Sequence, residues 1–382
     1  MNTGIYIHIP FCRTKCDYCS FYSVPTAAMS DDARNHCIDG YINALLNELH
    51  NRIEYHGIDV DTVYIGGGTP SLIPPSLINT LICVLKETFA VHQNAEITIE
   101  CNPEDIDTER IHQYIDSGVN RLTLGVQSVS TQMHSRIGRR GPVVTPEIMQ
   151  VFMDLKNVDH CIDLITGIPL QQRHELEEDI RFIERYRPEH ISAYMLSIEK
   201  GTPLSTRMNS TPEDEPIQRD NYFYFIEQCI AMGYCHYEIS NFALPGHESK
   251  HNLKYWKFMP YIGFGASAHT FYNGVRSCNN HTLEEYIASD IPCVIIDERS
   301  KNQMMAEYLM TALRLIDGFS DQEFYEVFRE AIPEKVAERF DTLSSQKLVT
   351  ISGMNSQKQY SLTMDGLFLL DTIVYHLTEP LL

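Results

Sequence analysis

The sequence has no apolar run that approaches the length of a bilayer-spanning helix, and no basic region followed by a long apolar core at its N-terminus. These absences predict a cytoplasmic protein with neither a membrane anchor nor a secretory leader. Basic residues are scarce as well. Thirty Lys and Arg stand against 51 Asp and Glu, which gives a formal net charge of −21. Because nucleic-acid binding needs a basic face, we expect no nucleic-acid partner.

The eleven cysteines are an odd number, and most are scattered as small buried residues usually are. Three are not scattered: Cys12, Cys16 and Cys19 follow the first apolar strand in "CRTKCDYC". A disulfide does not fit a reducing compartment. Structural zinc normally takes four ligands, and no second C-x-x-C or H-x-x-x-H pair lies nearby. Three thiolates on one loop suit a [4Fe–4S] cluster with one iron left open, and chance clustering of buried cysteines is the plain alternative.

Short β-rich runs alternate with amphipathic helical stretches over the first half of the chain. We expect strands at residues 4–9, 62–65, 96–100, 121–125, 160–165 and 190–196, with helices such as 39–54 and 76–89 between them. This alternation predicts an α/β fold with a parallel sheet. Since a closed (β/α)₈ barrel uses about 250 residues, the prediction is a partial (β/α)₆ barrel.

Three regions are expected along the chain: the partial barrel at 1–205, a barrel extension at 206–299 and a C-terminal domain at 300–382. A polar stretch at 205–216 precedes an expected helix at 219–232 and a loop-rich block at 233–280. The C-terminal pattern of helix, hairpin (347–363) and helix (364–377) resembles a winged helix, an α+β unit. Since only Arg339, Lys347 and Lys358 are basic between residues 338 and 382, we expect a packing or interaction role rather than DNA binding.

Polar residues and glycines gather where the predicted strands end. A glycine run alone predicts only a turn, and any one polar residue is more simply a surface residue. The carboxyl ends of parallel strands share one edge of a sheet, so together they indicate a site. These residues are Gly66, Gly67, Gly68 and Thr69 in "YIGGGTPS", Glu100 and Asn102 in "EITIECNPE", Gln127 in "RLTLGVQS", Arg139 in "RIGRR" and Asp163 in "CIDLITGIP".

The C-x₃-C-x₂-C spacing, with the aromatic Tyr18 before the last cysteine and GGGTP downstream, resembles the radical S-adenosylmethionine (SAM) superfamily. In that superfamily the open iron chelates SAM, and the reduced cluster cleaves it to methionine and a 5′-deoxyadenosyl radical. The resemblance thus implies a [4Fe–4S] cluster on Cys12, Cys16 and Cys19, with Tyr18 covering it, and an electron donor as a partner.

The whole chain is similar to the coproporphyrinogen III dehydrogenase-like group, through "YIHIPFC", "YIGGGTPSLI", "ISAYMLSIEKGTPL" and "YEISNFALPGHESKHNLKYW" among other segments. The resemblance implies no catalytic side chain but a set of SAM-binding residues. They are Tyr6, Tyr18, Gly66, Gly67, Gly68, Thr69, Glu100, Asn102, Gln127, Arg139, Asp163 and Ser197.

Two features favour the HemW-like heme chaperones of this group over its dehydrogenases. The dehydrogenases carry a fourth cysteine where this chain has Phe21, and they have an N-terminal extension where this chain has three residues before its strand. The implied function is to bind a cluster, SAM and heme, and to deliver heme to acceptors, among them respiratory, membrane-associated proteins. The alternative is a radical enzyme acting on a porphyrin, by oxidative decarboxylation of coproporphyrinogen III or by modification of heme.

The HemW-like group also has an H-N-x-x-Y-W motif implicated in heme binding, which here comprises His251, Tyr255 and Trp256. A neutral imidazole is a good axial ligand, and aromatic side chains stack on porphyrins. His247, His269 and Tyr255 are rival ligands, and simple packing of a loop is the plain alternative. One departure is that the G-R-x-H expected after the fourth strand reads Gly138-Arg139-Arg140-Gly141, without the histidine.

Overall fold

The computed structural model describes residues 2–208, 214–279, 282–289, 295–353 and 358–382. It divides into two units, which are described separately. The first comprises Met1–Gln228 and Pro260–Asp297, and the second comprises Cys229–Met259 and Glu298–Leu382. The three regions expected from the sequence, with boundaries after residues 205 and 299, stay a prediction.

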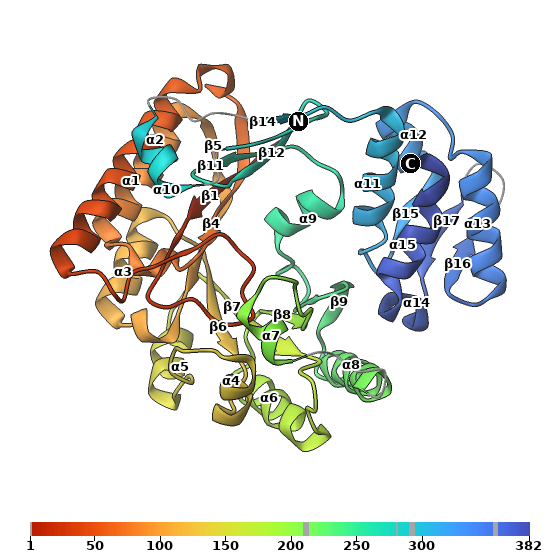
Figure 1. The fold of residues 1–382 in the computed structure, drawn as a ribbon, viewed down its shortest axis with the longest axis horizontal. Coiled ribbons are helices and arrows are strands. Elements are labelled where there is room, and N and C mark those ends of the chain that lie inside the picture. Colours follow the sequence, from red (N-terminus) through yellow and green to blue (C-terminus); the bar gives the residue numbers. More distant parts are fainter. Residues whose placement is uncertain (1, 209–213, 280–281, 290–294, 354–357) are drawn as a thin grey trace. The chain divides into compact units, whose positions relative to one another are not determined.

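A parallel sheet forms the centre of the first unit, as predicted. Its neighbouring strands follow chain order: β1 (Thr3–Ile9), β4 (Asp59–Gly67), β5 (Ala90–Cys101), β6 (Arg121–Gln127), β7 (Asp159–Thr166) and β8 (His190–Met195). The intervening helices cover the outer side of the curved sheet (Figure 1): α1 (Asp31–Asn51), α2 (Pro75–Thr88), α3 (Thr108–Ser117), α4 (Thr131–Ile137), α5 (Pro146–Met153) and α6 (Arg173–Tyr186). The connections contain the 3₁₀ turns η1 (Ile53–Tyr55), η2 (Pro70–Leu72) and η3 (Pro103–Asp105). The short helix α7 (Pro203–Arg207) and the longer helix α8 (Asp214–Ala231) follow β8. The predicted α/β partial barrel is confirmed.

Sequence pattern explains these elements. β1 reads TGIYIHI and is buried along almost its whole length, as a strand covered on both faces must be. In α2 the buried residues are Ile78, Leu81, Ile82 and Leu85, which lie on one helical face. Gly118 ends α3 with a φ of 106°, a conformation that favours glycine.

The sheet also continues on the other side of β1, where the sequence had suggested loops. β11 (Tyr261–Phe264) pairs in parallel with β1, and β12 (His269–Tyr272), β13 (Val275–Cys278) and β14 (Ile295–Asp297) follow as antiparallel neighbours. α10 (Leu283–Ala288) belongs to the same unit. These strands have only three or four residues each, too few to give a clear alternation.

The second unit combines helices with an antiparallel strand pair and a three-stranded antiparallel sheet. It contains β9 (Cys235–Glu238), β10 (Asn241–Ala243), α9 (Lys250–Trp256), α11 (Lys301–Ala312), β15 (Phe319–Ser320), α12 (Asp321–Phe328), α13 (Glu334–Ser345), β16 (Val349–Ser352), β17 (Gln359–Leu362), α14 (Met364–Phe368), α15 (Leu370–Thr378) and η4 (Glu379–Leu381). The predicted helix, strand pair and helix are confirmed at its C-terminal end, in the order α13, β16, β17, α14 and α15. The hairpin turn at 354–357 and residues 209–213 of the polar stretch lie outside the described residues. No helix in the described part of the chain is both long and apolar enough to cross a membrane.

Candidate functional site

The three cysteines lie on a loop that a short strand pair closes. β2 (Phe11–Cys12) pairs in parallel with β3 (Val24–Pro25). The amide of Val24 donates to the carbonyl oxygen of Pro10 at 2.6 Å, and the amide of Thr26 donates to that of Cys12 at 2.8 Å. Cys12, Cys16 and Cys19 are free thiols and half-buried. We call residues 12–19 the cysteine loop.

The cysteine loop borders a cavity of about 510 Å³ at the carboxyl ends of the strands. Most of the predicted SAM-binding residues line this cavity together with the three cysteines: Tyr18, Gly67, Gly68, Thr69, Glu100, Asn102, Gln127, Arg139, Asp163 and Ser197. Tyr6 and Gly66 do not line it. The hydroxyl of Tyr6 instead lies 3.0 Å from Nδ1 of His8. The strand ends thus bring together residues that are up to 185 positions apart in the sequence, from Cys12 to Ser197.

The glycine run packs directly against the cysteine loop. A Cβ on Gly68 would lie 2.6 Å from the carbonyl oxygen of Phe11, and Gly67 has a φ of 115°. The amides of Gly68 and Thr69 donate to the carbonyl oxygens of Ile9 and Phe11 at 2.8 and 2.7 Å. Larger side chains would push the two segments apart, so the glycines set the distance between the cavity wall and the cysteines.

Arg139 is held at the cavity by three hydrogen bonds. It donates from Nη2 to Oδ1 of Asn102 at 3.1 Å and to the carbonyl oxygen of Gly125 at 2.9 Å, and from Nη1 to the hydroxyl of Tyr18 at 3.4 Å. Within the described residues, its buried Nε has no hydrogen-bond partner. A fixed guanidinium with a free buried donor suits an anionic ligand such as a carboxylate. Arg140 belongs to the segment in which the histidine of the G-R-x-H pattern is missing, and it pairs with Asp17.

Two carboxylic acids lie deep in the cavity, and burial raises the pKa of both. Glu100 accepts hydrogen bonds from the hydroxyl of Tyr64 at 2.8 Å and from the amide of Gly67 at 3.1 Å, which partly offset the rise in its pKa. Burial, and then the nearby Glu100, raise the pKa of Asp163 to about 7. Sequence reasoning missed Tyr64, although it lies two residues before the glycine run, near the end of a strand.

Gln127 occupies a strained position in the wall of the cavity. Its φ is 65°, and the pairing of β6 with β7 shifts register between Gly125 and Gln127. Strained backbone and bulges of this kind concentrate at functional sites. Further lining residues that the sequence analysis did not name are Thr123, Tyr194, Met195 and Leu196. Tyr194, Met195 and Leu196 lie at or directly after the end of β8, which is the same signal that identified the others, whereas Thr123 lies within β6.

The cysteines fit an iron–sulfur cluster better than a single metal ion. In the part of the chain that the structure describes, no three His, Cys, Asp or Glu side chains are arranged around one ion. A cubane binds each cysteine to a different iron, so its ligands need not converge on one point. Burial raises the pKa of Cys12 and of Cys19, so binding of a cluster by these thiols would release protons.

The residues predicted to bind heme belong to α9 in the second unit. His251 is fully buried, and its Nε2 lies 2.9 Å from the hydroxyl of Tyr255. Burial, and then Lys254, lower the pKa of His251 to about 3. Trp256 lies under the guanidinium of Arg314, whose Cζ is 4.6 Å from the ring centre, and its indole nitrogen is buried with no partner in the described structure. These three residues form one cluster of contacting rings, in which Nε2 of His251 already has the hydroxyl of Tyr255 as its hydrogen-bond partner.

Comparison with known proteins gives a consistent assignment. Residues 6–183 match the model of the radical SAM superfamily. A protein from Escherichia coli (strain K12) named heme chaperone HemW is 33% identical over 358 residues, which cover 89% of this chain and 91% of the relative. A protein of the same name from Lactococcus lactis is 32% identical and covers 90% of each chain.

Among solved structures, the coproporphyrinogen III oxidase HemN from Escherichia coli, described as a radical SAM enzyme, has a TM-score of 0.82. It is 19% identical, and the match covers 99% of this chain and 90% of that one, so it supports the fold alone. Superfamily membership implies a [4Fe–4S] cluster and SAM, in agreement with the residues around the cavity. The chain therefore belongs to the radical SAM superfamily and, within it, to the family of proteins named heme chaperone HemW.

Proposed function

We propose that this protein is a heme chaperone that binds a [4Fe–4S] cluster through Cys12, Cys16 and Cys19, binds SAM in the adjoining cavity and delivers heme to acceptor proteins. The observation that carries the proposal is the gathering of three free cysteines, the glycine run and Arg139 around one cavity, in a chain of this family. When bound, the cluster would supply an iron with an open coordination position for SAM.

Different residues around the cavity would bind different parts of SAM. Arg139, with its unpaired buried Nε, would bind the carboxylate of the ligand. Glu100 and Asp163 are half-buried acceptors that line the cavity, and ribose hydroxyls are donors that such carboxyl groups bind. Tyr18 packs against the buried apolar residues Met133, Ile137, Ile165 and Ile168, so it would cover the cluster from one side.

Heme would bind at the His251, Tyr255 and Trp256 cluster of α9. The lowered pKa keeps the imidazole of His251 neutral near pH 7, which a metal ligand requires. Its Nε2 would have to exchange the hydroxyl of Tyr255 for iron, so heme binding is coupled to a rearrangement of this pair. Acceptor proteins, a donor of electrons to the cluster and transient membrane contact belong to the same proposal.

A turnover assay tests the chaperone against an enzyme. The reconstituted, reduced protein is incubated anaerobically with SAM and either heme or coproporphyrinogen III, and the porphyrins are analysed by mass spectrometry. We expect both compounds to be recovered unchanged. Phe21, which is exposed at the position of the dehydrogenases' fourth cysteine, favours this result. A decarboxylated or modified porphyrin that forms only with SAM would contradict the chaperone proposal.

A further inference from the structure

Three ion pairs hold the cysteine loop, one at the residue after Cys12 and two at the residue after Cys16. Arg13, next to Cys12, donates from Nη2 to Oδ1 of Asp105 at 2.5 Å. Asp17, next to Cys16, pairs through Oδ1 with Arg140 at 3.2 Å and through Oδ2 with Arg207 at 2.6 Å. Neither carboxylate was part of the site predicted from the sequence.

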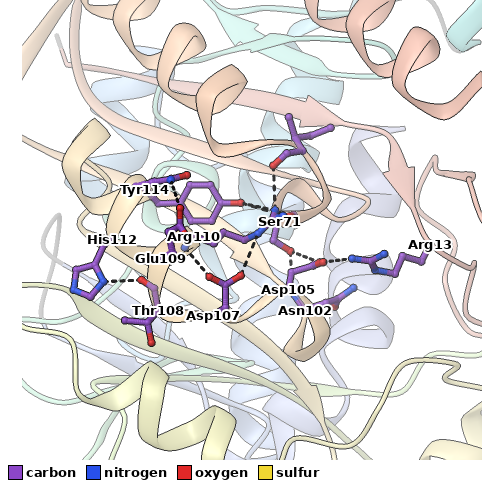
Figure 2. A network of polar contacts seen from close by, with 12 residues as sticks. Arg13, Ser71, Asn102, Asp105, Asp107, Thr108, Glu109, Arg110, His112 and Tyr114 are labelled. Atoms are coloured by element: carbon purple, nitrogen blue, oxygen red, sulfur yellow. Dashed lines mark hydrogen bonds and ion pairs between the residues drawn. The ribbon is translucent and has the colours of Figure 1, made fainter. Parts of the chain in front are cut away.

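Asp105 is fixed independently of the loop. Its side chain is 1% exposed, and its Oδ2 accepts a hydrogen bond from the hydroxyl of Ser71 at 2.8 Å. The same hydroxyl oxygen accepts from the amide of Asn102 at 3.1 Å, and Arg110 donates to the carbonyl oxygen of Ser71 at 2.5 Å. Figure 2 shows this network, with Arg13 reaching it from the cysteine loop. The segments after β4 and β5 therefore set the position of Asp105, and Arg13 ties the loop to them.

Asp17 joins three segments at the opposite end of the loop. Its amide donates to the carbonyl oxygen of Gly138 at 3.2 Å, and its own carbonyl oxygen accepts from the amide of Leu204 at 2.8 Å. Gly138 has a φ of 70°, and a Cβ there would lie 2.4 Å from Oδ2 of Asp17. Arg140 and Arg207 therefore approach a carboxylate whose backbone is already held on both sides.

Surface ion pairs contribute little when both partners move freely in water. Here the side chains of Asp105 and Asp17 are only 1% and 11% exposed. Each residue is also held by further hydrogen bonds, so each carboxylate has a fixed position. The loop residue held by Asp105 is Arg13, one residue after Cys12, and Asp17 itself lies one residue after Cys16. This spacing restricts both cysteines before any cluster is present.

We propose that Asp105 and Asp17 are positioning residues, which hold the cysteine loop in the conformation that takes up and retains the cluster. Asp105 acts through Arg13, and Asp17 acts through the ion pairs of its side chain with Arg140 and Arg207. The inference rests on the proposed binding of a [4Fe–4S] cluster by Cys12, Cys16 and Cys19.

The test measures how fast iron leaves the full-length protein after anaerobic reconstitution with iron and sulfide. A ferrous chelator reports the release, and the electron paramagnetic resonance spectrum of the reduced cluster reports its environment. We expect Asp105→Asn, Arg13→Gln and Asp17→Asn each to lose iron about tenfold faster than the wild type, as loss of an outer contact to a metal site does. Arg13→Lys keeps the positive charge, and its rate of iron release should lie between those of Arg13→Gln and the wild type.

Asp107→Asn is the matched control. Asp107 is an exposed acid two residues from Asp105, it pairs with Arg110, and Asn serves equally well at its helix N-cap. This variant should release iron at the wild-type rate. If Asp105→Asn fails to fold, Arg13→Gln decides, because Arg13 is half-exposed and lies outside the core.

Release at the wild-type rate from Arg13→Gln and Asp17→Asn, with normal spectra, would overturn this inference and leave the cluster proposal intact. Failure of the wild type itself to take up a cluster would overturn both. The two failures are therefore distinguishable in one series of samples.

Discussion

The hydroxyl of Thr69 donates a hydrogen bond to Sγ of Cys12 at 3.5 Å. Thr69 is buried and also accepts a hydrogen bond from the side-chain amide of Asn102 at 3.1 Å. Asn102 in turn accepts from Arg139. A continuous chain of hydrogen bonds thus joins Cys12, the first candidate cluster ligand, to Arg139, a candidate SAM-binding residue.

Thr69→Val should make the midpoint potential of the cluster more negative. A hydrogen bond to a cysteine sulfur stabilises the more negative, reduced cluster, so its loss favours the oxidised form. One neutral hydrogen bond of about 1 kcal/mol corresponds to roughly 40 mV for one electron. A redox titration followed by electron paramagnetic resonance measures the shift. Thr69→Ser keeps the hydroxyl and should stay near the wild-type potential, and an equal shift in both variants would count against the hydrogen bond as the cause.

Arg139→Gln should weaken SAM binding by about 100-fold, since it removes a charged, positioned partner for the ligand's carboxylate. The change that SAM causes in the spectrum of the reduced cluster measures the affinity. Arg136→Gln is the control, because Arg136 donates to the carbonyl oxygen of Pro169 and does not line the cavity. Equal SAM affinity in wild type and Arg139→Gln would remove Arg139 from the site.

Variants of the His251 and Tyr255 pair should affect heme binding in opposite directions. His251→Ala should weaken binding at least about tenfold, since it removes the proposed ligand. Tyr255→Phe should strengthen heme binding. It removes the hydroxyl that bonds Nε2 of His251, so heme iron no longer has to displace this hydroxyl. Titration with heme, followed by the Soret absorption band, measures both. His247→Ala and His269→Ala should bind like the wild type, and a loss in either of them with none in His251→Ala would move the axial ligand.

Asp163 should make the cluster-free protein less stable as the pH rises. Its pKa is about 7 in the folded protein and about 3.9 in an unfolded chain, so the folded state binds the extra proton between these values. Its contribution is therefore fully present below pH 4 and is lost as the pH rises through 7.

Asp163→Asn removes this loss, and its free energy of unfolding at pH 8 should exceed that of the wild type by up to about 4 kcal/mol, with little difference near pH 4. Urea unfolding at the two pH values measures the difference. Asp179, whose pKa burial also raises to about 7, remains in both proteins, so only the difference between them reports on Asp163. Parallel pH profiles would show that Asp163 is ionised at neutral pH in the folded state.

The sequence predicted the central sheet because its strands are apolar runs separated by amphipathic helices. It also predicted most of the cavity, because the ends of parallel strands share one edge. β11 was not predicted, because a strand of four residues is too short to show a periodic pattern, and its pairing with β1 joins segments far apart in the sequence. The ion pair of Arg13 and Asp105 was not predicted either. The two residues are 92 positions apart, and in the sequence each resembles an ordinary surface charge.

A heme titration of the anaerobically reconstituted protein, followed by absorption spectroscopy, is the decisive test of the proposed heme chaperone. A heme chaperone should develop a Soret band that saturates at a fixed ratio of heme to protein, and the bound heme should pass unchanged to an added heme-free acceptor protein. Absence of a saturable Soret band, in a protein whose cluster and SAM binding are intact, would show that the protein is not a heme chaperone and point to radical chemistry on another substrate.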